Sequence, residues 1–111
     1  MSMILNAVRL AACAAVLMWS LAGAQPIEAR RAVLFNLVKQ DCGSCHGLTM
    51  KGGLGPALEP RAWAGKDDEQ MRHVILHGRP GTPMPPWKDF VTEDEARWIV
   101  QMLKQGLPDA R

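Results

Sequence analysis

The 111-residue chain contains no tyrosine, and its aromatic side chains are limited to two phenylalanines and four tryptophans. It has only three cysteines, and its 13 basic and 11 acidic residues give a formal net charge of +2. So little aromatic bulk in so short a chain leaves room for one small domain with a thin core. The near-neutral charge argues against a nucleic-acid-binding domain, which would show a basic stripe.

The first 24 residues have the pattern of a secretory signal peptide. Arg9 precedes an unbroken apolar run over residues 10–24, and no acidic residue occurs before Glu28. The run ends in Ala22-Gly23-Ala24, small residues of the kind that a signal peptidase accepts. It is shorter than the roughly 20 apolar residues of a spanning helix. We therefore expect residues 1–24 to be cleaved and residues 25–111 to form the exported domain.

Cys13 lies inside this leader and is lost with it. A lipoprotein signal ending at Cys13 would need an apolar region before it, but Asn6 and Arg9 interrupt that region. The mature chain then keeps two cysteines, which in an exported protein would by default form a disulfide.

A more specific interpretation follows from the sequence Cys42-Gly43-Ser44-Cys45-His46. Two thiols flank two small residues, and an imidazole follows directly. This spacing is typical of the covalent attachment of a c-type haem, in which the sulfurs bond to the vinyl groups and the histidine binds iron.

Two loops rich in glycine or proline complete this pattern. Residues 47–58 include four glycines within nine residues, and we expect Pro56 to present its carbonyl to the second ring nitrogen of His46. Residues 77–87 contain four prolines and two glycines, which exclude a helix or a central strand. They present Met84, the candidate sixth iron ligand. The rival methionines 71 and 102 fall on helical stripes, and Met50 follows His46 too closely.

Three helices are predicted around these loops. The first covers residues 26–40, with an apolar face listed here: Ile27, Val33, Leu34, Phe35, Leu37 and Val38. The second covers residues 67–76, capped by Asp67, stopped by Gly78 and burying Met71, Val74 and Ile75. The third opens at Thr92 with a capping box to Glu95, ends at Gly106 and buries Ala96, Ile99, Val100 and Leu103.

In this order of elements, residues 28–107 resemble a class I cytochrome c. More narrowly, residues 39–58 and 77–85 resemble the NirC-type small periplasmic cytochromes of denitrifying bacteria. The resemblance implies an all-α fold wrapped around one covalently bound haem c, with thioether bonds at Cys42 and Cys45. It implies axial ligation by His46 and Met84.

The resemblance also suggests roles outside the ligand set. Trp63 and Arg79 could approach the haem propionates, although a core role for Trp63 and a solvated loop position for Arg79 stay open. Phe35 and Trp98 stand where the family has an aromatic pair at the crossing of the terminal helices.

The function implied by the resemblance is that of a monomeric, periplasmic one-electron carrier rather than an enzyme. Its redox partners would be the respiratory nitrite reductase or the dehydrogenase that completes the specialised haem of that enzyme. A small haem enzyme or a sensor with an open distal site is the alternative function.

Three other interpretations of the cysteines and histidines are open. Cys42, Cys45, His73 and His77 could form a zinc site, although this would leave His46 without a role. A thioredoxin-like enzyme would need strands around Cys42 and Cys45, and no alternating pattern indicates them. His73 or His77 could replace Met84 as an iron ligand.

Overall fold

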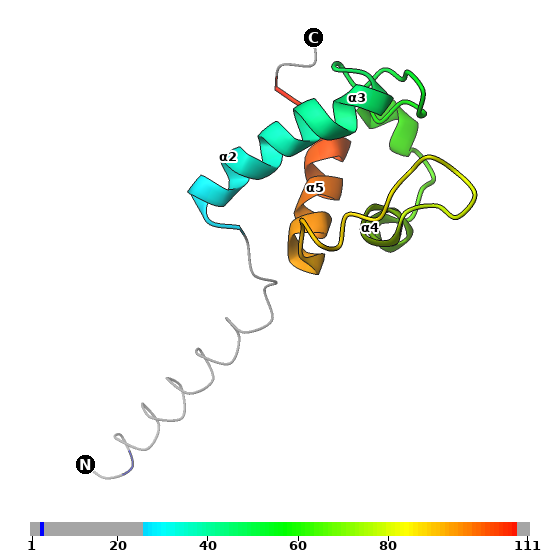
Figure 1. Cartoon of the computed structure of the whole chain (residues 1–111). Coiled ribbons are helices and arrows are strands. Elements are labelled where there is room, and N and C mark those ends of the chain that lie inside the picture. The colour runs from blue at the N-terminus through cyan, green and yellow to red at the C-terminus, as the bar shows by residue number, and fades with distance from the viewer. Residues whose placement is uncertain (1–2, 4–25, 109–111) are drawn as a thin grey trace.

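The computed structural model describes residue 3 and residues 26–108, and it contains only helices and loops within these residues (Figure 1). The predicted signal peptide, apart from Met3, lies outside the described residues. The elements are α2 (Glu28–Leu37), η1 (Val38–Cys42), α3 (Gly43–His46), η2 (Pro60–Trp63), α4 (Asp68–His77) and α5 (Glu93–Gln105). None of the described helices has both the length and the hydropathy needed to cross a bilayer. The all-α prediction is confirmed.

The first predicted helix is in fact three consecutive elements, α2, η1 and α3. It begins at Glu28, and its backbone passes through the π-helical turn η1 before returning to α-helix at Gly43. Leu34 and Val38 are fully buried, as predicted. Ile27 and Val33 are exposed, which corrects the expected apolar face: Ile27 precedes the helix as its N-cap, and Val33 points away from the core.

Helix α4 has the predicted ends. Asp67 accepts a hydrogen bond from the backbone N–H of Gln70 at 2.8 Å, and Gly78 ends the helix with a φ of 70°. Its expected buried stripe is only half-buried, while Leu76 enters the core with 3% of its surface exposed. Helix α4 therefore keeps an apolar face that the polypeptide only partly covers.

Helix α5 forms as predicted. Thr92 and Glu95 make both hydrogen bonds of a capping box, at 3.2 and 2.9 Å. The expected buried stripe is confirmed, and these residues are listed here: Ala96, Ile99, Val100 and Leu103. Phe35 and Trp98 are half-buried and pack against the core that this stripe forms.

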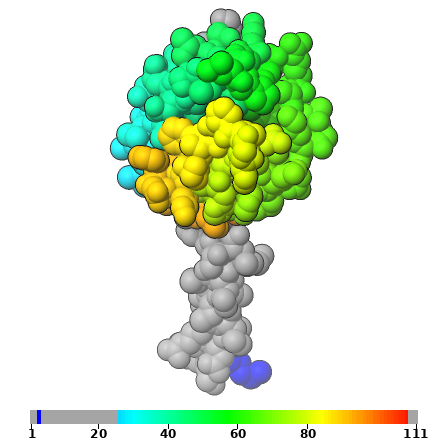
Figure 2. Space-filling view, turned by 45° about the vertical axis from the view of Figure 1, so that its right-hand side comes forward, coloured from blue at the N-terminus to red at the C-terminus, as the bar shows by residue number. Residues whose placement is uncertain are grey.

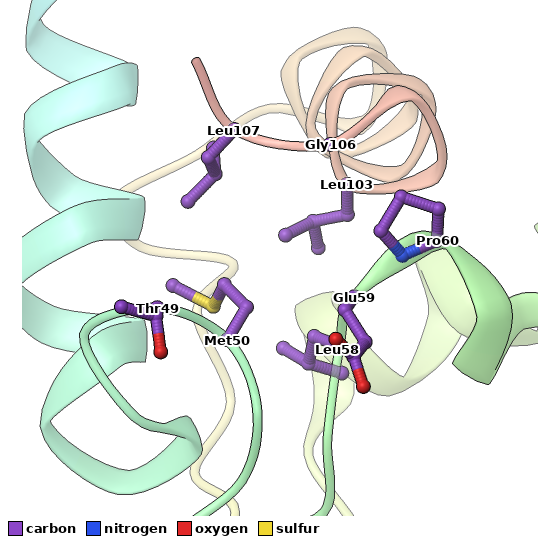
Figure 3. Close-up of a pocket in the computed structure, with 8 residues that line it drawn as sticks. All are labelled: Thr49, Met50, Leu58, Glu59, Pro60, Leu103, Gly106 and Leu107. Carbon is purple, nitrogen blue, oxygen red and sulfur yellow. The ribbon is translucent and has the colours of Figure 1, made fainter. Parts of the chain in front are cut away.

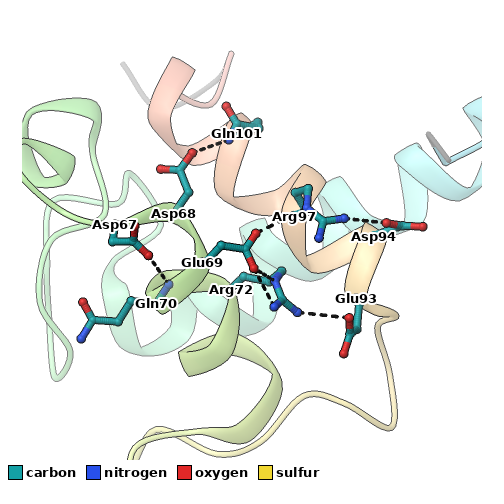
Figure 4. Close-up of polar contacts among 9 residues, drawn as sticks. All are labelled: Asp67, Asp68, Glu69, Gln70, Arg72, Glu93, Asp94, Arg97 and Gln101. Carbon is teal, nitrogen blue, oxygen red and sulfur yellow. Dashed lines mark hydrogen bonds and ion pairs between the residues drawn. The ribbon is translucent and has the colours of Figure 1, made fainter. Parts of the chain in front are cut away.

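Helices α4 and α5 are joined by ion pairs at their polar edge (Figure 4). Arg72 lies 2.7 Å from Glu69 on its own helix and 3.4 Å from Glu93 of α5, and Glu69 lies 3.6 Å from Arg97. Asp68 accepts 2.8 Å hydrogen bonds from two α5 side chains, Gln101 and Lys104. The apolar stripes and these pairs together fix how α4 packs on α5.

Helix α5 is also tied to α2. The Arg30 guanidinium lies 2.7 and 3.0 Å from the two carboxylate oxygens of Glu95 and donates to the Phe90 carbonyl at 2.8 Å. The hydrogen bond from Arg30 lowers the pKa of the Glu95 carboxyl. These contacts join residues that are 60 or more positions apart in the chain.

A small cavity of about 120 Å³ lies between the end of α5 and the loops before η2 (Figure 3). Its lining is mostly apolar and includes Met50, Leu58 and Leu103. None of the predicted cofactor or metal ligands is among its lining residues, so this cavity is a packing feature of the domain.

Candidate functional site

The π-helical turn η1 positions the two cysteines. The buried positions on this segment are Leu34, Val38 and Gly43, so the last step covers five residues instead of the four of an α-helix. An unbroken α-helix would have placed Cys42 on the buried stripe. The extra residue turns Gly43 inward and leaves Cys42 half-buried at the edge of the core.

Both cysteines are free thiols, and they differ in environment. Cys42 is half-buried, whereas Cys45 is exposed. Burial raises the pKa of the Cys42 thiol to about 11, and the neighbouring Asp41 carboxylate adds to the shift. No disulfide joins Cys42 and Cys45 in the structure, so both sulfurs are available for thioether bonds.

The glycine loop folds back onto the end of α3. Backbone N–H groups of Gly52 and Gly55 donate to the carbonyls of His46 and Cys45, each at 2.8 Å. These bonds satisfy carbonyls that the short helix leaves without partners. Gly47 has a φ of 88°, and a Cβ atom there would lie 2.7 Å from the Gly52 carbonyl, so the turn requires glycine.

The loop orients the His46 imidazole. Its Nδ1 lies 2.7 Å from the Pro56 carbonyl oxygen, which confirms the expected contact. A carbonyl oxygen can only accept, so Nδ1 carries the proton and the lone pair of Nε2 is available for a metal. Gly55 packs against the ring so closely that a Cβ atom would lie 2.8 Å from Cε1 and Nδ1.

Met84 is half-buried on the loop that follows α4. Its carbonyl accepts from the Arg79 N–H at 3.2 Å, and its own N–H donates to the Thr82 hydroxyl at 3.4 Å. The Trp87 N–H then donates to the Ile75 carbonyl at 3.0 Å, which attaches the end of the loop to α4. In Figure 2 this loop, in yellow, lies on the same face as the green segment that contains residues 42–46.

The three rival methionines, Met50, Met71 and Met102, lie in the core or pack against it. Met50 is 2% exposed and adopts a φ of 59°, and a Cβ atom on Gly43 would lie 3.6 Å from its methyl carbon. Its carbonyl accepts from the N–H groups of Leu58 and Glu59 at 2.8 and 3.1 Å. Met71 and Met102 pack against the core.

The structure shows the surroundings of Trp63 and Arg79, for which the sequence left two roles open. Trp63 is 7% exposed, and its indole N–H donates to the Leu58 carbonyl at 2.9 Å, so the core role is the one that the structure supports. The Arg79 side chain is exposed on the loop, which agrees with the solvated loop position considered for it. The sequence offered no signal for the Trp63 bond or for the packing of Gly55 against His46.

The zinc alternative is wrong for the residues that the structure describes. They contain no cluster of three or more His, Cys, Asp or Glu side chains able to hold a metal ion. His73 and His77 are instead exposed neighbours on α4, with ring centroids 4.5 Å apart. The thioredoxin-like alternative is also wrong, since no strand flanks Cys42 and Cys45 in residues 26–108.

The helical fold, the Cys-x-x-Cys-His turn and the ordered histidine define a small c-type cytochrome. The chain belongs to the family described as cytochrome C oxidase, cbb3-type, subunit III, whose model matches residues 29–103. Within it, the chain is of the NirC-type small cytochromes.

The relatives support this placement. Cytochrome c55X of Pseudomonas aeruginosa is 52% identical over 86 residues, which are 78% of this chain and 72% of that protein. The solved c-type cytochrome NirC is 51% identical with a TM-score of 0.71, covering 72% of this chain and 94% of that one. Dihydro-heme d1 dehydrogenase of P. aeruginosa is 39% identical over 72 residues, 65% of this chain but only 15% of that protein.

The cofactor of this family is a covalently attached haem c, and the site is chemically suited to it. The thiols of Cys42 and Cys45 are free, and Nε2 of His46 carries a lone pair. The half-buried apolar face of α4 would add surface against which a flat macrocycle could pack.

Proposed function

We propose that the chain is a periplasmic one-electron carrier of denitrification in which Cys42 and Cys45 hold the haem and His46 and Met84 are its axial ligands. The observation that carries this proposal is the 2.7 Å contact between His46 Nδ1 and the Pro56 carbonyl, which fixes one ligand nitrogen. The loop of Met84, attached to α4, supplies a thioether with little entropy left to lose on ligation.

This ligand set determines the chemistry. The haem supplies a one-electron Fe(III)/Fe(II) couple, and a histidine with a methionine raises its potential. With His46 and Met84 both bound to it, the iron would have no position left for a substrate. We therefore favour an electron carrier over a haem enzyme or a sensor.

The proposed partners follow from the relatives. Over the aligned residues, the chain is 52% identical to cytochrome c55X and 51% identical to NirC, and it is also similar to a part of dihydro-heme d1 dehydrogenase. We propose that it exchanges electrons with that dehydrogenase or with the respiratory nitrite reductase that uses the finished haem. A brief encounter of two monomers through a small interface suits such exchange. The export pattern of residues 1–24 supports a periplasmic location.

Replacement of Met84 by leucine tests the ligand assignment, because leucine keeps the apolar bulk but removes the sulfur. We expect the potential of the Met84→Leu protein to fall by on the order of 0.1 V and its reduced form to bind carbon monoxide promptly. Met102→Leu, on α5, is the matched control and should change neither property. A wild-type reduced protein that binds carbon monoxide at once would favour the enzyme or sensor.

The partner proposal is tested by stopped-flow mixing of the reduced protein with each purified enzyme. We expect oxidation of the haem by at least one of the two, at a rate that rises with enzyme concentration. A reduced unrelated cytochrome c of similar potential serves as the control. Exchange no faster than that of the control would contradict the partnership but leave the ligand assignment intact.

A further inference from the structure

Two histidines remain outside the haem site. His73 and His77 lie one turn apart on α4, and both side chains are exposed. Their rings contact each other, and among the described residues neither ring takes part in a hydrogen bond or an ion pair. We propose that His73 and His77 form a surface chelate for a divalent transition-metal ion of the kind that imidazole prefers, Cu²⁺ or Zn²⁺.

The geometry suits one ion shared by two rings. Positions four apart on an α-helix lie on the same face, and the two ring centroids are 4.5 Å apart with a 42° angle between the planes. Metal–nitrogen distances of about 2.1 Å require the two ligating nitrogens to lie roughly 3.3 Å apart. Side-chain rotation alone can achieve this, because nothing else holds either ring.

The position on the helix favours a cation. His77 is the last residue of α4, where the partial negative charge of the helix end attracts positive charge. At the other end of α4, the carboxylates of Asp68 and Glu69 form ion pairs with side chains of α5. The ion would therefore bind at the end of α4 that leads into the loop of Met84.

The same contacts limit the site to two protein ligands. Glu69 is four residues before His73, the spacing at which a carboxylate could have been a third ligand. Its oxygens lie 2.7 Å from Arg72 and 3.6 Å from Arg97. Water would complete the coordination, and Cu²⁺ should bind more tightly than Zn²⁺, as the order of stability of divalent ions requires.

Calorimetric titration of the ferric holoprotein with CuCl₂ and with ZnCl₂ tests the site, because the ferric haem gives no electron to Cu²⁺. We expect one ion per molecule and an unchanged haem spectrum. His73→Ala and His77→Ala should each weaken binding by about a hundredfold, since a chelate loses its second, intramolecular ligand. Circular dichroism checks that the variants are folded.

A register control keeps the number of histidines constant. In the double variant Gln70→His and His73→Gln the two rings are seven residues apart, two turns along the helix, and cannot share an ion. The Asp67 cap persists because it uses the Gln70 backbone N–H. This variant should bind as weakly as His73→Ala, and Glu69→Gln should bind like the wild type.

Three results would overturn the proposal. They are the absence of binding by the wild type, wild-type affinity in the register variant, and a loss in Glu69→Gln as large as that in His73→Ala. None of them bears on the haem ligands, because the carbon monoxide and potential measurements are made on Met84 variants.

Discussion

Replacement of Gly55 by alanine should displace the ring of His46, the proposed iron ligand, without changing that residue itself. A Cβ atom at this position would lie 2.8 Å from two atoms of the His46 ring and 3.3 Å from the third. The Gly55 backbone does not have a positive φ, so alanine is compatible with its conformation. The clash with the ring is the principal effect of the substitution.

The size of the effect follows from these distances. Carbon atoms in contact are about 3.5 Å apart, so the ring must move by roughly 0.7 Å. A shift of this size is enough to weaken or break the 2.7 Å hydrogen bond to Pro56. That bond makes the imidazole a better donor to ferric iron, and a hydrogen bond is worth about 1 kcal/mol. Its loss should raise the potential by roughly 40 mV, since 59 mV corresponds to a tenfold change for one electron.

Redox titration of the Gly55→Ala holoprotein measures this shift, and chemical unfolding measures the accompanying loss of stability. Gly65→Ala is the matched control: its φ is 72°, so alanine is strained there, but no atom lies within 4 Å of the added Cβ. It should lower stability and leave the potential unchanged. Equal potentials in the wild type and Gly55→Ala would refute the role assigned to the Pro56 bond.

Three further predictions concern stability. Leu34→Ala should lower the free energy of unfolding by about 2 to 5 kcal/mol because Leu34 is fully buried, whereas exposed Val33→Ala should change it by less than about 0.5 kcal/mol in the same guanidinium titration. Thr92→Ala should cost about 1 kcal/mol through loss of the α5 cap, and a cost near zero would contradict the capping box. Hydrogen bonds from Lys104 and Arg72 lower the pKa values of Asp68 and Glu69 below their ordinary 3.8 and 4.5. The two ionised carboxylates therefore stabilise the fold at a pH above these ordinary pKa values, and this stability is lost as the pH falls through the lowered pKa values. The melting temperature of the wild type should decline between pH 5 and pH 2, about the range in which carboxyl groups titrate. In the double variant Asp68→Asn/Glu69→Gln this decline should be smaller.

Local chemistry in the sequence was sufficient to predict the helices α4 and α5. Asp67, Thr92 and Glu95 are caps whose partners lie within three residues, and Gly78 ends α4 by its own backbone preference. The Pro56 contact was also predictable, because the attachment motif fixes where the histidine stands and the glycines shorten the return of the chain.

Features that depend on long-range packing were not predictable. The exposure of Val33 and the entry of Leu76 into the core depend on where α5 lies, which helical periodicity alone does not specify. The π-helical turn η1 had no signal in residue type, since Val38–Cys42 contains neither glycine nor proline. Nor does any local pattern place Met50 in the core with a positive φ.

The π-helical turn has a consequence for the length of the chain. The wide turn at Val38–Cys42 absorbs one extra residue. Removal of one residue there would therefore restore an α-helix and leave Gly43 and the residues after it facing the same way. Natural variants that keep the cofactor should therefore include chains one residue shorter before Cys42, whereas the spacing from Cys42 to Pro56 should be nearly invariant. Insertions should be found instead around Gly65, where an added Cβ meets nothing within 4 Å.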